Sequence, residues 1–295
     1  MTTGTPANGT PANGTAANGT AGPGPGGHLS AFDLVRAEGG ARALAGWAVE
    51  QLTTAAQRGP GPVEAKDHPA DLVTPVDRAV EAHVRSVLAE QFPAHAVLGE
   101  ETGGPADAGG RPLWLVDPVD GTTNFAHGIA WSSFALALLD GDGTPQVGVV
   151  ADPWRGETFT AVRGHGARCN DAPVTSGDAR TLAGHVVLTE WSAHRPWPGM
   201  NEFLAALADR YCTSRIMGSS ALSLVQVAAG RAAGAVLGSD DPLDTAAGRL
   251  IATEAGAAVS THRASRDRDP SGTVTLLVAA VPALAGELRH LAAST

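Results

Sequence analysis

The chain has 295 residues, 43% of them hydrophobic, enough for one large domain or for two lobes that share a core. Its net charge of −10 and pI near 5.4 argue against the basic patch of a nucleic-acid-binding protein. Cys169 and Cys212 form neither a disulfide framework nor a metal-binding spacing. No apolar run approaches the roughly 18 residues of a membrane helix, and the N-terminus lacks the features of a signal peptide. We therefore expect a cytoplasmic protein that binds neither nucleic acid nor membrane.

The first residues form a low-complexity segment that repeats TPANG twice and TAANG once before a Gly/Pro stretch. Such a segment has almost nothing apolar to bury, so it cannot offset the entropy that ordering it would cost. We predict a disordered tail over 1–27 and a folded domain over 28–295. The domain is expected to consist of two lobes, approximately 28–175 and 176–295.

Two helices are predicted at the start of the folded part. Apolar residues recur at helical spacing over 30–57 and again over 74–92, where Pro75 suits the first helical position. Glycine, proline and charged residues over 58–71 indicate a loop between the two helices. Strand-like runs follow, separated by turn-rich stretches, at 95–98, 113–116, 131–139, 146–151 and 157–163.

The second half of the chain alternates more regularly between the two kinds of element. Strands are predicted at 185–189, 213–216, 233–237 and 273–279. Helices are predicted at 200–209, 220–229, 242–255 and 281–292. This pattern predicts an α/β protein built from layered sheets, with no linker after the tail.

The stretch LWLVDPVDGTTNF, residues 113–125, places two acids directly after a predicted buried strand. The carboxyl ends of strands are the usual place for ligand chemistry in α/β folds. A tight turn can aim Asp117, Asp120 and the Val119 carbonyl at one point, and Gly121 permits a close backbone approach. Oxygen ligands of this kind suit Mg²⁺, whereas the same pattern also fits a simple turn with helix caps.

Further acids occupy comparable positions elsewhere in the chain. Glu100 and Glu101 follow the predicted strand 95–98, again at its carboxyl end. Asp77 in TPVD and Asp244 in DPLD each stand at the start of a predicted helix. Taken singly, solvation explains the two glutamates and helix capping explains the two aspartates.

Taken together, these segments resemble the inositol monophosphatase family, of the Mg²⁺-dependent, lithium-sensitive-type phosphatase superfamily. The motifs stand in order across about 30–260: Lys66 with DLVTPVD (71–77), GEE (99–101), DPVDGTTNF (117–125) and DPLDTAAGRLIATEAGA (241–257). The resemblance implies the layered α-β-α-β-α sandwich of inositol monophosphatases and fructose bisphosphatases. It also implies a homodimer and a Mg²⁺-dependent phosphomonoesterase that acts on a small-molecule phosphate ester.

The resemblance further implies the metal ligands. Glu100, Asp117 and the Val119 carbonyl would hold one Mg²⁺. Asp117, Asp120 and Asp244 would hold a second, and Glu100 would also serve a weaker third site. Independently of the resemblance, so many carboxylates in one cleft repel one another, and bound Mg²⁺ offsets that repulsion.

Catalytic roles are carried over in the same way. Asp77 and Thr122 would orient and help deprotonate the attacking water, with Glu100 taking part through its metal. The backbone N–H groups of Gly121 and Thr122 would receive the phosphate. The residues expected to contact the substrate are Asp120, Gly121, Thr122, Leu237 and Asp244.

Leu237 marks a departure from the family pattern. Inositol-cleaving members carry a glutamate there, seven residues before the metal aspartate, and a site loses its discrimination for a hydroxyl when that acid becomes apolar. The expected substrate is therefore a small polyol, sugar, amino-alcohol or nucleoside phosphate, with inositol 1-phosphate or histidinol phosphate as specific alternatives. Trp191, His194 and Trp197 either reach this pocket or lie at a surface or interface.

Other functions fit the sequence less well than a metal-dependent phosphatase. Haloacid-dehalogenase-type phosphatases space their two aspartates two residues apart, whereas the spacing here is three, and no GxxxxGK[ST] motif exists. A bacterial relative works in transcription antitermination, so a non-catalytic regulatory binding protein of the same fold is the remaining alternative. The intact acids favour the enzyme.

Overall fold

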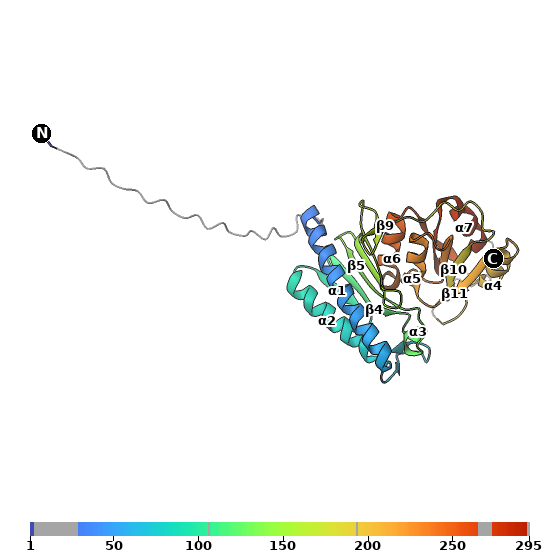
Figure 1. Ribbon diagram of the computed structural model, residues 1–295, viewed down its shortest axis with the longest axis horizontal. Helices are drawn as coiled ribbons and strands as arrows, with labels where there is room; N and C mark the ends of the chain where they lie inside the picture. Colours follow the sequence, from blue (N-terminus) through green and yellow to red (C-terminus); the bar gives the residue numbers. More distant parts are fainter. Residues whose placement is uncertain (3–28, 106, 193, 265–272, 294–295) are drawn as a thin grey trace.

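The computed structural model consists of five alternating layers of helices and sheets (Figure 1). Across the molecule, the two helices at the start of the folded chain, the first sheet, two middle helices, the second sheet and two outer helices succeed one another. This order confirms the predicted α-β-α-β-α sandwich. The structure describes residues 1–2, 29–105, 107–192, 194–264 and 273–293. The predicted tail therefore lies almost wholly outside the described residues.

Two helices cover the outer face of the first sheet (Figure 1). α1 (Ala31–Arg58) begins after the capping residue Ser30. α2 (Pro75–Gln91) begins at a capping box in which Thr74 and Asp77 bond reciprocally. Both helices occur where helical spacing of apolar residues predicted them, and the buried residues of each recur at intervals of three or four.

The first sheet has seven strands in the order β3-β4-β5-β6-β7-β8-β9. Only β3 and β4 are parallel, so the loops that follow these two strands leave from the same edge. The strands are β3 (Ala96–Gly99), β4 (Leu113–Asp120), β5 (Ser133–Leu139), β6 (Pro145–Asp152), β7 (Glu157–Val162), β8 (Ala167–Cys169) and β9 (Ala172–Val174).

β4 is buried along its whole length because the sheet has a helical layer on each face. Trp114 and Val116 pack with α1 and α2, while Leu113 and Leu115 pack with the helices on the opposite face. This explains why the strand reads as a continuous apolar run before the first acid.

The middle layer consists of α5 (Ser220–Ala228) and α6 (Pro242–Glu254), which lie between the two sheets. α5 is buried on all sides from Ala221 to Ala228, as expected for a helix that is apolar around its whole circumference. The close approach of α6 to the first sheet depends on Gly148 of β6, because a Cβ there would lie 2.9 Å from the Ala247 carbonyl oxygen.

The second sheet has the order β11-β10-β12-β14-β13, with parallel pairing among β10, β11 and β12. Its strands are β10 (Val186–Glu190), β11 (Thr213–Ile216), β12 (Gly234–Leu237), β13 (Ala258–Ala264) and β14 (Val274–Ala280). The outer layer consists of α4 (Met200–Ala208), the 3₁₀ turn η2 (Pro282–Leu284) and α7 (Ala285–Ala293). None of the helices in the described ranges has the length and apolar character to cross a membrane.

Several short elements differ from the sequence prediction. The predicted loop 58–71 contains one strand of a small hairpin, β1 (Glu64–Ala65), which pairs with β2 (Leu72–Val73). β8, β9 and β13 were not predicted, because two are very short and the third is only partly buried. β4 continues to Asp120 instead of ending at residue 116.

Two glycine substitutions test the packing of these layers in opposite directions. Gly148→Ala should destabilise the fold by about 1–3 kcal/mol, because the added methyl pushes α6 away from β6. Gly46 lies at an exposed position of α1, and a Cβ there would have no atom within 4 Å. Gly46→Ala should therefore stabilise the fold by about 0.5–1 kcal/mol. Urea unfolding of both variants measures the difference. Equal effects would contradict this account of the β6–α6 contact.

Candidate active site

A β-bulge at the end of β4 organises the central acids. Asp117 pairs with Ala135 of β5, but Asp120 pairs with Ser133, so the register shifts between them. In a regular strand, residues three apart face opposite sides of the sheet, and a bulge removes that alternation. Val119 N–H donates to Asp117 Oδ1 at 3.0 Å and closes the turn.

Gly121 follows the bulge in a left-handed conformation, with φ at 91°. A Cβ at this position would lie 2.8 Å from the Gly218 carbonyl oxygen, so both the conformation and the space require glycine. The short helix α3 (Thr122–Ala126) begins directly afterwards. The sequence correctly indicated a close backbone approach here.

Asp77 and Thr122 come together from α2 and α3 at this bulge. Thr122 Oγ1 lies 3.2 Å from Asp77 Oδ1 and 2.9 Å from the Val119 carbonyl oxygen, so its proton has two acceptors. Asp77 Oδ2 accepts the Thr74 N–H at 2.9 Å and also the Thr74 hydroxyl. Burial raises the pKa of Asp77, and these bonds counteract only part of that effect.

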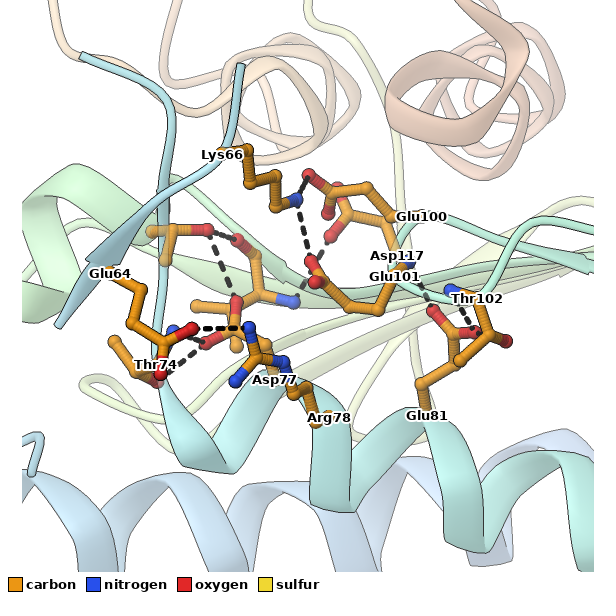
Figure 2. A network of polar contacts seen from close by, with 12 residues as sticks. Glu64, Lys66, Thr74, Asp77, Arg78, Glu81, Glu100, Glu101, Thr102 and Asp117 are labelled. Atoms are coloured by element: carbon orange, nitrogen blue, oxygen red, sulfur yellow. Dashed lines mark hydrogen bonds and ion pairs between the residues drawn. The ribbon is translucent and has the colours of Figure 1, made fainter. Parts of the chain in front are cut away.

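The hairpin of β1 and β2 brings a cation to the acids that follow β3. Lys66 Nζ lies 2.7 Å from Glu100 Oε1 and 2.6 Å from Glu101 Oε1, as Figure 2 shows. Burial opposes the charged ammonium, but bonds to both glutamates raise the pKa of Lys66. Burial raises the pKa of Glu101, whose side chain is only 5% exposed.

Asp120 connects the first sheet to the middle layer. Its carboxylate accepts the Ser219 hydroxyl at 2.5 Å and the N–H groups of Ser220 at 3.2 Å and Ala221 at 2.7 Å. These donors form the N-terminus of α5, where a negative charge is favoured. Burial nevertheless raises the pKa of Asp120 to about 6.

Asp117 and Asp244 complete the acidic cluster. Asp241 caps α6 through the Leu243 N–H at 3.0 Å, and Asp244 lies in the first turn of that helix. Burial raises the pKa of Asp117 well above its ordinary value, and the negative charges of Glu100 and Asp120 raise it further. Burial, followed by Asp120, raises the pKa of Asp244 well above its ordinary value.

The donor set fits a hard cation in its chemistry. Carboxylates of Glu100, Asp117, Asp120 and Asp244 interact electrostatically, with the Val119 carbonyl oxygen at the same bulge. Such oxygen ligands are those that Mg²⁺ prefers, and its charge would offset their repulsion. Among the described residues, however, no three His, Cys, Asp or Glu side chains are already gathered as a metal-binding group.

Leu237 is placed differently from the residues above. It lies at the end of β12, pairs with Glu190 and Leu277, and is 0% exposed within the hydrophobic core. Its contact with the substrate stays a prediction.

The three aromatic residues of the loop after β10 have separate environments. Trp197 is buried, and its indole N–H donates to Thr189 Oγ1 at 3.2 Å, so it belongs to the core. Trp191 is 48% exposed. His194 stacks on His68 of the β1–β2 hairpin with ring centroids 4.1 Å apart, which joins segments from the two halves of the chain.

Glu190 is a buried acid that the sequence analysis did not single out. Its carboxylate accepts the Gly218 N–H at 2.6 Å and the Ser223 hydroxyl at 2.7 Å, next to the turn that holds Asp120. Burial raises the pKa of Glu190 to about 8. The available signal was an acid ending an apolar strand, the same pattern that drew attention to Asp117.

The fold and the site together indicate a class of protein: a layered α/β sandwich in which carboxylates at strand ends and at a helix start can act as oxygen ligands for a metal ion. A sequence profile of the inositol monophosphatase family matches residues 33–294. The chain belongs to this family, which confirms the resemblance and supports a phosphatase-type function.

Individual relatives carry two different names. Nus factor SuhB of Pasteurella multocida is 38% identical over 220 residues, covering 74% of this chain and 81% of that protein. Inositol-1-monophosphatase of Synechocystis sp. is 35% identical over 205 residues, covering 69% of this chain and 71% of that protein.

Solved structures give the same two names. Inositol monophosphatase from Anabaena has a TM-score of 0.73 at 29% identity, covering 88% of this chain and 96% of that one. Mycobacterium tuberculosis SuhB has a TM-score of 0.69 at 29% identity, covering 87% and 95%.

A pH-dependent stability measurement tests the environment of Glu190. The unfolded chain releases this proton near the ordinary pKa of 4.5, whereas the folded chain keeps it to about 8. Wild-type stability should therefore fall as pH rises across that window, and Glu190→Gln should remove this contribution. The melting temperature of the variant, relative to wild type, should rise between pH 5 and pH 8 in EDTA. A constant difference would show that Glu190 is not held protonated.

Proposed function

We propose that this protein is a Mg²⁺-dependent phosphomonoesterase that hydrolyses a small polyol, sugar, amino-alcohol or nucleoside phosphate with metal-activated water. The observation that carries the proposal is the cluster of Glu100, Asp117, Asp120 and Asp244. Asp117 and Asp120 come from β4, Glu100 from the loop after β3 and Asp244 from α6. Burial and neighbouring acids raise the pKa values of Asp117, Asp120 and Asp244, so these groups oppose one another's ionisation. Lys66 is a cation that acts on the cluster, through Glu100 and on Asp244. A divalent cation would restore the balance of charge.

The proposed ligands divide between two ions. Glu100, Asp117 and the Val119 carbonyl would hold one Mg²⁺, and Asp117, Asp120 and Asp244 a second, with a weaker third site at Glu100. When bound, the metal supplies an activated water, a receptor for phosphoryl oxygens and stabilisation of the leaving alkoxide.

The residues of the chain have separate tasks in this proposal. Asp77 accepts a hydrogen bond from Thr122 Oγ1, which turns the oxygen lone pairs of Thr122 toward the water and holds that water for attack. The same hydroxyl also contacts the Val119 carbonyl, so the water-orienting pair is tied to the metal-binding turn. The N–H groups of Gly121 and Thr122 would hold the phosphate.

The residue at position 237 bears on which phosphate ester the enzyme accepts. Leu237, without a carboxylate, removes the hydroxyl acceptor expected of an inositol-cleaving site. The name of the Synechocystis relative still favours inositol 1-phosphate as one specific candidate, with histidinol phosphate as another. A panel that also includes fructose 1,6-bisphosphate, phosphoadenosine phosphate and nucleoside 5′-phosphates distinguishes them by Mg²⁺-dependent phosphate release.

A second candidate function is a non-catalytic regulatory role. Relatives named Nus factor SuhB are the observation that favours it. The acidic net charge of −10 opposes direct nucleic-acid binding. Turnover of any ester in the panel decides for the enzyme, and silence with Mg²⁺ bound points to an unusual substrate or to the regulatory protein. The homodimer and the cytoplasmic location stay predictions.

Asp117→Asn tests the proposed bridging ligand. The variant should lose more than nine-tenths of the phosphatase rate, since it removes a ligand from both ions. Without Mg²⁺ it should melt no lower than wild type, because neutralising a buried acid relieves repulsion. Asp209→Asn, at an exposed position ending α4, serves as the control. Retention of more than about a tenth of the rate would overturn this assignment.

A further inference from the structure

One face of α2 carries three charged side chains in succession. Asp77, Glu81 and Arg85 are spaced four residues apart, so they lie one above the other along the helix. Asp77 contacts Thr122, as described above, while the other two contact the loop after β3. Figure 2 shows Asp77 and Glu81 rising from the same helix toward the acids.

Glu81 is completely buried, and its carboxylate is saturated with donors. It accepts the N–H groups of Glu101 at 2.6 Å and Thr102 at 3.0 Å, together with the Thr102 hydroxyl. Arg85 Nε donates to it at 2.8 Å. Although burial acts in the opposite direction, these bonds lower the pKa of Glu81, so the carboxylate is held ionised.

Arg85 extends this contact along the same loop. Its guanidinium donates to the carbonyl oxygens of Val97, at 3.3 Å, and Gly103. Gly99 and Gly103 also pair with each other, each N–H lying 3.1 Å from the other's carbonyl oxygen. The loop is thereby closed at its base and held from α2.

Gly99 shows how closely the loop is fitted to the carboxylate. A Cβ at this position would lie 2.4 Å from Cδ of Glu81, so only glycine leaves room for the acid. Glu100 directly follows Gly99 in the closed loop, and its N–H donates to the Val116 carbonyl oxygen at 3.2 Å. The side chain of Glu100 itself has Lys66 as its bonded partner.

We propose that Glu81, supported by Arg85, is a positioning residue that fixes the 99–103 loop and thereby sets Glu100 against Asp117 for Mg²⁺. Glu81 acts only by holding the loop, and it contacts neither the metal nor the substrate itself. α2 then fixes both the water-orienting Asp77 and the metal-binding Glu100 from one rigid element. This inference rests on the proposed function, because it assigns Glu100 to the metal.

The test measures Mg²⁺ binding directly, by titration calorimetry and by the Mg²⁺-induced rise in melting temperature, alongside turnover. Glu81→Gln keeps the size of the side chain but removes its charge and sets an amide against backbone donors. We expect the Mg²⁺ dissociation constant and half-saturating concentration to rise about tenfold or more. The rate at saturating Mg²⁺ should fall much less.

Two milder variants keep the proposal testable if Glu81→Gln fails to fold. Thr102→Val removes one donor to Glu81, and Arg85→Lys keeps the charge but loses the fork that reaches Val97 and Gly103. Both should weaken Mg²⁺ binding in the same direction and by a smaller factor.

Two control variants on or beside the same helix separate positioning from general stability. Glu64→Gln breaks the exposed ion pair with Arg78, whose side chains are 58% and 53% exposed, and should leave Mg²⁺ binding unchanged. Val84→Ala removes buried apolar contact from α2 without touching the loop, so it should lower the melting temperature only. If Val84→Ala weakens Mg²⁺ binding as much as Glu81→Gln, the positioning role is overturned.

The arms also separate this inference from the function on which it rests. Wild-type protein that binds no Mg²⁺ would overturn the proposed metal site, and the inference with it. Wild-type protein that binds Mg²⁺ and turns over an ester, together with a folded Glu81→Gln variant of equal Mg²⁺ affinity, would overturn the inference alone.

Discussion

Mutual repulsion among desolvated acids is the constraint on which the rest of this structure depends. Asp117, Asp120 and Asp244 each resist ionisation because they are removed from water and lie near one another and near Glu100. The acids are brought together from three places: Asp117 and Asp120 from β4, Glu100 from the loop after β3 and Asp244 from α6. The layered sandwich does this, because strand ends and helix starts meet at one edge.

Each acid is accordingly held by its own local device. The β-bulge turns Asp117 and Asp120 out of simple alternation, and the N-terminus of α5 supplies Asp120 with three donors. Asp244 occupies the first turn of α6, and Glu100 follows β3 on a closed loop. The parallel pairing of β3 and β4 is what delivers Glu100 and Asp117 to the same edge. The fold thus fixes the backbone positions from which these acids extend.

Most of the fold and the central acids could be predicted because they are local in the sequence. Periodic apolar residues specify α1, α2 and the long strands, and DPVDGTTNF marks its own turn. Contacts between distant segments could not be predicted in this way. Glu81 and Glu190 look like ordinary acids in sequence, and only the packed structure shows which backbone groups they satisfy. The burial of Leu237 likewise depends on its pairing with β10 and β14.

The bonds from Asp120 to the start of α5 also bear on how the protein folds. Asp120 and Ser219 are 99 residues apart in the chain, so their contact closes a long loop and requires both sheets to be in place. Such non-local contacts form late in folding, because the chain must first lose the entropy of loop closure before the contact stabilises it. The first half alone contains Glu100, Asp117 and Asp120 but lacks Asp244 and the donors at the start of α5. The proposed metal site would therefore be complete only after the chain has been synthesised past Asp244 and α6 has packed against the first sheet.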